Sequence, residues 1–381
     1  MARILVLGGT SWLGGTVAAE AAHRGHEVIC LARGQSGPAP EGTTLVRADR
    51  DRADAYAALP GLPGLPGLPA NDLVAAPAAA SGTVATATPT AMATATPTAD
   101  VEYDLVVDVA RQPRHVRGAL AALSERTSNW VFVSSCSAYA RQDEHGADES
   151  AQLLPAAADD LVRAEEYGRG KVACEQAVTL ARGARALIVR SGLIVGAGDP
   201  SERFAYWPSR FALAAEDGGP VVVPAQVERP VQWVDVVDLS AWLLTAGLTG
   251  VTGIVNAMGT AQSLGTVLDQ ACATAEFNGQ TFAVDDDGLV AAGVEEFMGP
   301  RSLPLWLHDP GWSAFLDRDA TTARELGLRQ RPLADTMSDA LDTERRLGLG
   351  RRRERAGLDR DTELELVATV RRGRGTGRSG G

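Results

Sequence analysis

Tyr167 and Lys171 are the side chains whose types and spacing point most directly to chemistry. Residues four positions apart share one face of a helix, so the ammonium would stand near the phenol and stabilise its phenolate. A free tyrosine has a pKa near 10, and lowering it to about 7 takes roughly 4 kcal/mol of preferential stabilisation of the anion. Tyr167 would then be a general acid and base. The alternative is a solvated helix pair, but Lys171 is the one lysine among 36 basic residues, which favours a chemical role.

Hydroxyl groups follow an apolar run that ends at Ser134 and Ser135. The carboxyl ends of parallel strands form the edge of a sheet where ligands bind. Ser135 is therefore expected to bond to a substrate oxygen while Tyr167 moves its proton. The alternative is that these serines cap the next turn.

A glycine-rich turn near the start, GGTSWLG from Gly8 to Gly14, lies between a short apolar run and a helical stretch. Glycines there allow a tight turn and close approach of a pyrophosphate to backbone amides, and the helix N-terminus adds partial positive charge. Ser11 replaces a glycine of the usual pattern, so its side chain must point away from the dinucleotide or bond to it. The residues expected to line this cofactor site are Gly8, Thr10, Ser11, Trp12, Leu13, Gly14, Val109, Ala110, Tyr167 and Lys171.

The end of the second predicted strand indicates which dinucleotide is preferred. A site for NAD usually carries an acid there for the ribose 2′-hydroxyl, whereas this chain has Arg33. A guanidinium pairs well with a 2′-phosphate, so NADP is favoured, with NAD as the alternative. Asp49 is a candidate acceptor for the adenine amino group, and Arg50 could add to the positive charge. The alternative for Arg33 is an ordinary surface position.

Elements that must position these groups alternate along the first half of the chain. Apolar strand-like runs lie at 3–7, 27–32, 44–46, 104–109, 130–134 and 186–190, with helical patterns at 14–24, 115–123 and about 158–180. The fold class predicted is α/β, with a Rossmann-like doubly wound parallel sheet over 1–190. Residues 58–100 are a low-complexity insertion that is expected to be flexible.

The later residues predict a smaller substrate-binding lobe at 191–349 that partly returns to the core, followed by a polar helical end and a disordered basic tail at 350–381. Substrate-binding candidates, beside Ser135, are Arg203, Tyr206, Trp207, Arg210 and Arg229; the alternative for the aromatic ones is a place in the core of the lobe.

Composition excludes several classes of protein. A net charge of -12 argues against nucleic-acid binding, and no apolar stretch is long enough for a membrane span. The four cysteines and five histidines are scattered, so neither disulfides nor a metal site is expected. A cytoplasmic location fits these features.

These motifs together resemble the extended short-chain dehydrogenase/reductase superfamily, in its NAD-dependent epimerase/dehydratase branch. The segments GGTSWLG, FVSSCSAY, YGRGK and RPVQWVDVVDL occur in the expected order over about residues 1–345. The resemblance implies a catalytic triad of Ser135, Tyr167 and Lys171, with Arg229 near a substrate phosphate, and by analogy a homodimer. Three positions depart from the pattern. Cys136 and Ser137 replace the Asp-Glu pair of 4,6-dehydratases, and Leu193 stands where many sugar-nucleotide epimerases have asparagine.

The function predicted is an NAD(P)-dependent oxidoreductase that moves hydride between nicotinamide and a secondary alcohol or ketone carbon of a small-molecule substrate. One alternative is a nucleotide-sugar epimerase that works by transient oxidation. Another is a non-catalytic NAD(P)-binding regulatory protein.

Overall fold

Seven parallel strands form the central sheet of the computed structural model, which describes residues 1–59 and 102–376. Their spatial order is β11-β6-β5-β4-β1-β2-β3. The strands are β1 (Arg3–Leu7), β2 (Glu27–Ala32), β3 (Thr44–Arg47), β4 (Tyr103–Asp108), β5 (Thr127–Ser135), β6 (Ala186–Ser191) and β11 (Gly253–Ala257). Because the order of strands reverses between β1 and β4, the crevice outside their carboxyl ends is where such a fold binds ligands.

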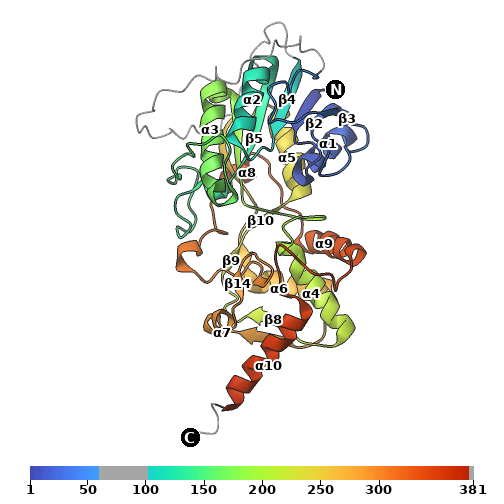
Figure 1. The fold of residues 1–381 in the computed structure, drawn as a ribbon, viewed down its shortest axis with the longest axis vertical. Coiled ribbons are helices and arrows are strands. Elements are labelled where there is room, and N and C mark those ends of the chain that lie inside the picture. The colour runs from blue at the N-terminus through green and yellow to red at the C-terminus, as the bar shows by residue number, and fades with distance from the viewer. Residues whose placement is uncertain (60–101, 377–381) are drawn as a thin grey trace.

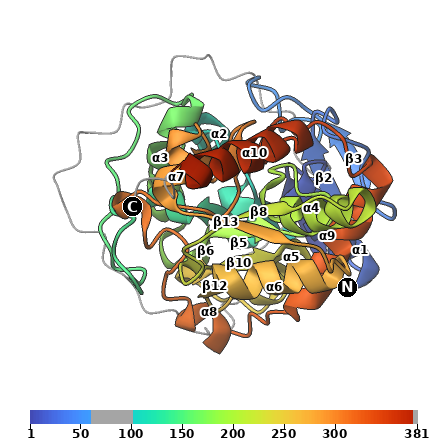
Figure 2. The same cartoon turned by 90° about the horizontal axis from the view of Figure 1, so that it is seen from below.

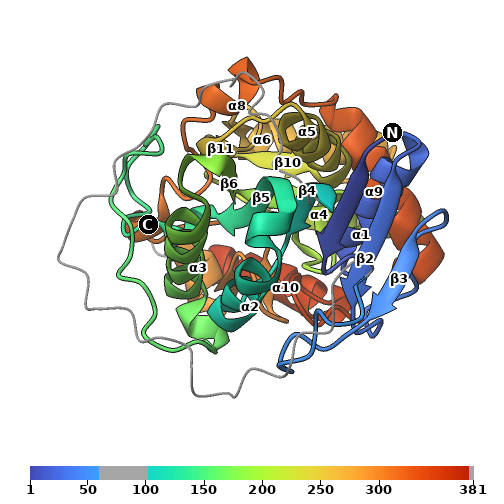
Figure 3. The same ribbon diagram turned by 90° about the horizontal axis from the view of Figure 1, so that it is seen from above.

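Helices cover both faces of this sheet (Figure 3). They are α1 (Trp12–His23), α2 (Pro113–Leu123), α3 (Tyr167–Arg182) and α5 (Val236–Leu248). Ile4 and Val6 of β1 pack with residues of α1 and α5, whereas Leu5 and Leu7 pack with residues of α2 and α3. A strand that is buried on both faces has to be apolar at every position, which explains the continuous apolar runs. The predicted doubly wound α/β fold is confirmed.

A smaller lobe lies beneath the carboxyl edge of the sheet (Figure 1). Its elements are β7 (Leu193–Val195), α4 (Arg203–Asp217), β8 (Val221–Pro224), β9 (Pro230–Val231), β10 (Trp233–Asp235), β12 (Gln262–Ser263), α6 (Leu264–Thr274), β13 (Thr281–Val284), α7 (Asp286–Ala291), β14 (Glu295–Glu296), β15 (Ser302–Leu303), α9 (Leu333–Leu347) and α10 (Arg360–Thr376). Helix α8 (Thr321–Glu325) packs on β11 instead. The β8–β13 pair lies between α10 and α6 (Figure 2). Trp207, Trp233 and Trp306 are fully buried in the core of this lobe.

The sheet domain differs from the prediction in one helix boundary and one additional strand. Helix α3 begins at Tyr167 rather than near residue 158, because the side chain of Gln112 bonds to both the N–H and the carbonyl of Val162 and holds that stretch outside the helix. Strand β11 was not predicted; it is short and contains the polar Asn256, whose side chain accepts a hydrogen bond from Tyr139 at 2.6 Å. Most of the 58–100 insertion lies outside the described residues.

The C-terminal end is part of the lobe. The predicted helical end is present as α10, and Leu358, Leu366 and Val367 join the same buried cluster as Trp207 and Trp306. The packing therefore shows no boundary near residue 350. Residues 377–381 of the predicted basic tail lie outside the described residues.

Candidate active site

The glycine-rich turn connects β1 to α1 at the carboxyl edge of the sheet. Gly8 has a φ of +96°, and a Cβ there would lie 2.8 Å from Val109 of the loop after β4. A Cβ at Gly9 would lie 2.5 Å from the sulfur of Cys30 on β2, and one at Gly14 would lie 2.3 Å from the carbonyl oxygen of Gly8. Glycine is thus needed for the turn to approach both neighbouring strands. The resulting cradle has the form that a pyrophosphate requires.

Ser11 and Trp12 hold this turn in place. The hydroxyl of Ser11 donates to the carbonyl of Gly8 at 2.7 Å and accepts from the amide of Gly14 at 3.3 Å, which caps α1. The serine side chain therefore bonds to its own backbone rather than filling the cradle. The indole of Trp12 donates to the carbonyl of Ala197 at 2.8 Å and ties the turn to the loop after β7. Thr10 is buried and Leu13 is half-buried beside them.

The expected adenosine end of the site carries exposed charge. Arg33, after β2, is exposed. Asp51 accepts from His115 at 2.8 Å, and this bond, with smaller contributions from Arg114 and Arg33, holds the pKa of Asp51 below its usual value. The carboxylate of Asp49 accepts from the amide of Asp51 at 3.1 Å and orders the turn after β3. The sequence analysis missed Asp51, which partly offsets the charge of Arg33.

Arg50 does not have the predicted role beside a cofactor phosphate. Its guanidinium pairs with both oxygens of Asp108, at 2.9 and 3.1 Å, and also bonds to the hydroxyl of Tyr56 and the carbonyl of His115. Arg50 is the partner that the fully buried carboxylate of Asp108 needs at the end of β4. A buried ion pair, rather than a ligand contact, explains this arginine.

The ammonium of Lys171 is anchored beneath the same edge of the sheet. It donates to the carbonyl of Ala110 at 2.7 Å and to the carbonyl of Val133 at 2.6 Å. The residue is only 2% exposed, and the nitrogen lies 5.7 Å from the centre of the Tyr167 ring. An ammonium has three N–H donors, so one remains for a further acceptor. The predicted pair of Tyr167 and Lys171 is thus brought together beside the glycine turn.

Tyr167 is the first residue of α3, where the helix packs on a short 3-10 helix at Cys136–Ala138. A Cβ at Gly168 would lie 2.1 Å from the carbonyl oxygen of Ser137, so only glycine permits this approach. The hydroxyl of Ser135 accepts from the amide of Ser137 at 3.1 Å and donates to the hydroxyl of Ser137 at 3.2 Å. Ser135 therefore caps this turn. Among the described residues, no hydrogen bond joins it to Tyr167.

The sequence matches the model of the NAD dependent epimerase/dehydratase family over residues 4–257, which is more than half of the chain. The protein belongs to this family. No curated protein matches the sequence.

Solved structures of the family share the fold. A Burkholderia cenocepacia J2315 protein described as an epimerase has a TM-score of 0.62 and 21% identity, over 91% of this chain and 98% of that one. The UDP-glucose 4-epimerase of Thermus thermophilus, in complex with NAD, has a TM-score of 0.56 and 17% identity, over 90% and 99% of the two chains. TunA, an NAD dependent NDP-hexosamine 5,6-dehydratase, has a TM-score of 0.59 and 16% identity, over 92% and 99%. At such identities the likeness shows the fold.

Three of the predicted substrate-binding residues belong to the core of the lobe instead. Tyr206 and Trp207 are 0% exposed, and the indole of Trp207 donates to the carbonyl of Pro304 at 2.9 Å. Arg210 bonds to the carbonyl of Leu358 and lies 3.4 Å from Glu363 of α10. These predictions were wrong because the aromatic segment is not a loop. It forms α4, which is buried along most of its length.

Arg229 lies in the family segment that returns to the core, but its guanidinium is occupied. Both terminal nitrogens bond to the carboxylate of Asp286, which also accepts from the indole of Trp306 at 2.9 Å. Arg229 and then Trp306 keep the pKa of Asp286 below its usual value. The charge of Arg229 is therefore already balanced by a carboxylate, although three of its five N–H donors are not used by these two bonds. Leu193, at the position of the epimerase asparagine, is 3% exposed and packs in the lobe core.

Arg203, the first residue of α4, is a predicted substrate residue with an unpaired polar atom. Its guanidinium lies over the ring of Phe297, 4.6 Å from the centre, and its buried Nε has no hydrogen-bond partner in the described part of the chain. Burial lowers its pKa, while Asp199 and Tyr167 act in the opposite direction, which places Arg203 within electrostatic range of the candidate acid/base.

A buried polar network behind Ser135 was missed at the sequence level. Glu175 of α3 pairs with Arg190 of β6 at 2.8 Å and accepts from Ser134, while Arg190 also bonds to the hydroxyl of Tyr139 at 3.1 Å. Burial raises the pKa of Cys136 to about 12. These groups fix the end of β5 against α3, and Glu175 lies four residues after Lys171 on the same helix. This spacing, which places both side chains on one face of the helix, is the one feature of the sequence that could have indicated the network.

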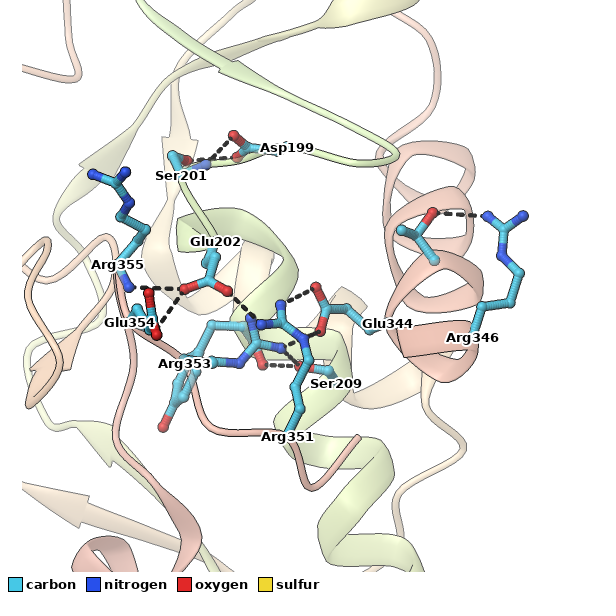
Figure 4. Close-up of polar contacts among 12 residues, drawn as sticks. Asp199, Ser201, Glu202, Ser209, Glu344, Arg346, Arg351, Arg353, Glu354 and Arg355 are labelled. Atoms are coloured by element: carbon cyan, nitrogen blue, oxygen red, sulfur yellow. Dashed lines mark hydrogen bonds and ion pairs between the residues drawn. The ribbon is translucent and has the colours of Figure 1, made fainter. Parts of the chain in front are cut away.

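The chain from Arg351 to Arg355 is held against α4 and α9 by a set of ion pairs, the C-terminal clamp (Glu202, Glu344, Arg351 and Arg353; Figure 4). Glu344 bonds to Arg351 at 3.0 Å and to Arg353 at 2.6 Å. Glu202, in the left-handed region with a φ of +61°, pairs with Arg351 and accepts from the amide of Arg355 at 2.8 Å. The clamp therefore fixes the residue that precedes Arg203.

The described residues contain no group of three or more His, Cys, Asp or Glu side chains placed to hold a metal ion. Within them, no helix is both long and apolar enough to cross a membrane.

Proposed function

We propose that this member of the epimerase/dehydratase family is an NAD(P)-dependent oxidoreductase acting on a secondary alcohol or ketone. The observation that carries the proposal is the placement of Tyr167 and Lys171. The lysine is anchored to carbonyls at the ends of β4 and β5, and Val109, beside Ala110, touches the glycine cradle. An acid/base group and a dinucleotide cradle therefore lie at the same edge of the sheet.

The residues present fit a dinucleotide. The cradle of Gly8, Gly9 and Gly14 has no room for a Cβ, and the first turn of α1 contains no acidic side chain that would repel a pyrophosphate. When bound, the nicotinamide supplies or accepts the hydride. Arg33 at the end of β2 supports NADP over NAD, and the named NAD complex of a family neighbour supports the broader assignment.

Tyr167 donates a proton to the substrate oxygen in reduction and accepts it in oxidation. Lys171 has one N–H left after its two carbonyl bonds, and this donor stabilises the phenolate or holds a ribose hydroxyl. Ser135 turns its single proton from Ser137 toward the substrate oxygen. It can do so without losing its cap, because the bond from the Ser137 amide uses a lone pair.

A nucleotide-sugar epimerase is the second candidate function, because a solved neighbour is a UDP-glucose 4-epimerase. It needs the same three residues together with contacts to a diphosphate. Leu193 is buried and offers no polar contact, and the charge of Arg229 is already balanced by Asp286, so both positions are less suited to a diphosphate than in the family pattern. We therefore rank simple oxidation and reduction first.

Replacing Tyr167 with Phe tests the proposal. We expect NADPH affinity to be retained within about twofold, and reduction of 1-phenylpropane-1,2-dione or butane-2,3-dione to fall about 10²–10⁴-fold, which is the usual contribution of a general acid. NADPH absorbance gives the rate, and calorimetric titration gives the affinity. UDP-glucose and UDP-galactose, assayed in parallel, test epimerisation.

Tyr103→Phe is the matched control, since the hydroxyl of Tyr103 has no hydrogen-bond partner among the described residues and the residue begins β4, away from the carboxyl edge. Its turnover should equal that of the parent. Undiminished turnover in Tyr167→Phe would show that Tyr167 is not the general acid and base. Tight NADPH binding with no turnover of ketones or nucleotide sugars would favour the non-catalytic alternative.

A further inference from the structure

A second feature of the active-site edge is a cavity of about 410 Å³ between the loop after β5 and the 311–312 turn of the lobe. This volume lies within the range of small-molecule sites. Ser137, Leu154 and Trp312 are among its lining residues. Trp312 is 44% exposed, an unusual state for a large apolar side chain in a hollow.

The cavity adjoins the candidate catalytic residues. The hydroxyl of Ser137 is 3.2 Å from that of Ser135. A Cβ at Gly168, next to Tyr167, would approach the carbonyl of Ser137 at 2.1 Å and the side chain of Leu154 at 2.8 Å. Two of the residues that line the cavity, Ser137 and Leu154, are thus those against which the first turn of α3 packs.

Most polar side chains of the cavity are already paired with one another or with the backbone. Arg141 and Asp143 form two bonds, both at 3.1 Å. The amide nitrogen of Gln142 donates to the carbonyls of Cys136 and Tyr139, and its oxygen accepts from Arg318 at 2.5 Å. These bonds balance the charges at the rim of the cavity, and Leu154 and Trp312 supply apolar side chains.

Aromatic rings continue from this cavity toward Arg203. Trp312 meets Phe315 edge-on at 5.4 Å, and Phe315 meets Phe297 edge-on at 5.5 Å. The Phe297 ring in turn lies under the guanidinium of Arg203. Phe297 has a φ of +61°, which a bulky residue seldom adopts. The lobe thus presents a row of aromatic rings, with one end at the cavity and the other within electrostatic range of Tyr167.

We propose that this cavity receives an aryl group attached to the reacting carbon, so that the substrates are aryl ketones and aryl carbinols rather than nucleotide sugars. The inference rests on the proposed function and names the substrate class for that site. Trp312 stacks on or meets the edge of the aryl ring, with Leu154 as the apolar wall. The hydroxyl of Ser137 stands on the side of the cavity that leads to Ser135.

The test measures affinity without turnover. With oxidised cofactor bound, a ketone cannot be reduced, so calorimetric titration at saturating NADP⁺ gives the dissociation constants of 1-phenylpropane-1,2-dione and of its alkyl counterpart butane-2,3-dione. We expect the aryl probe to bind at least tenfold more tightly. In Trp312→Ala, its affinity should fall about tenfold while that of the alkyl probe stays within twofold. Trp312→Phe should retain most of the aryl affinity.

Val290→Ala, which removes another exposed apolar side chain on α7, should leave both affinities unchanged. Equal affinity for the two probes in the parent protein would overturn the inference. Equal losses in Trp312→Ala, or binding of UDP-glucose more tightly than the aryl probe, would do so too. These titrations do not depend on Tyr167. If the aryl probe binds more tightly but Tyr167→Phe keeps full turnover, the aryl subsite is supported and the role of Tyr167 as the acid/base is rejected.

Discussion

One lysine in a chain that otherwise uses arginine has a physical explanation in its surroundings. The Lys171 ammonium is buried between two carbonyl oxygens and lies 4.9 Å from the centre of the Phe132 ring. A guanidinium carries five N–H donors in a rigid plane, and this space offers two acceptors. Arginine would leave several buried donors unpaired. The sequence alone singled out this position, whereas the acceptors come from residues 38 and 61 positions away.

Arg33→Ala tests the preference for NADP at the level of a single residue. We expect NADP affinity to fall about tenfold and NAD affinity to change less than twofold, because a bond between charged groups contributes about 1.5–3 kcal/mol and exposure reduces that gain. Fluorescence titration of both reduced cofactors measures the difference. Arg185→Ala, an exposed arginine beyond the far end of α3, is the control. Equal losses of both cofactors would dismiss the 2′-phosphate contact.

At the scale of elements, the sequence was sufficient where burial imposes a simple pattern. Strands covered on both faces are continuous apolar runs, so β1, β2 and β5 were predicted closely. Helix α4 was not predicted. Its aromatic residues are buried on all sides by other parts of the chain, and in the sequence alone they resemble residues of a loop that lines a pocket. The start of α3 depends on Gln112, a contact 50 residues away along the chain. Hydrogen bonds between residues so far apart in the chain produce no periodic pattern in the sequence, so they cannot be predicted from it.

Gly168→Ala tests the contact between α3 and the turn after β5. The added Cβ would lie 2.1 Å from the carbonyl oxygen of Ser137, so the start of the helix must move. We expect turnover to fall more than tenfold, because small displacements of an acid/base group are costly, with a loss of about 1–3 kcal/mol in unfolding free energy. Assays with the aryl dione and urea unfolding report the two effects.

Gly118→Ala on α2 is the control for this prediction, since its Cβ would make an ordinary 3.5 Å contact with Tyr56. Alanine is also the better helix former, so stability should be equal or higher. Full activity in Gly168→Ala would show that the position of Tyr167 does not depend on this close packing.

At the scale of the whole molecule, the proposed site is assembled from two bodies with different cores. The sheet domain supplies Tyr167, Lys171 and the glycine cradle, whereas the lobe supplies Arg203, Phe297 and Trp312. Chain segments far apart in sequence hold the lobe side in place. Glu202, directly before Arg203, bonds to the chain near Arg355, about 150 residues later. Residues 350–367, which look like a polar appendage in the sequence, thus complete the lobe.

Glu344→Gln tests whether the C-terminal clamp stabilises the lobe. Glu344 and Arg353 are 4% and 6% exposed, and neutralising one partner leaves a buried guanidinium without its counter-charge, which typically costs about 3–5 kcal/mol. We expect urea unfolding to show a loss of that order and aryl-dione turnover to fall, while NADPH affinity stays within twofold, because the glycine cradle belongs to the other body. Asp342→Asn removes an exposed carboxylate of the same helix and should change stability by less than about 1 kcal/mol. If NADPH affinity falls in step with turnover in Glu344→Gln, the two bodies do not act separately and the clamp supports the whole molecule.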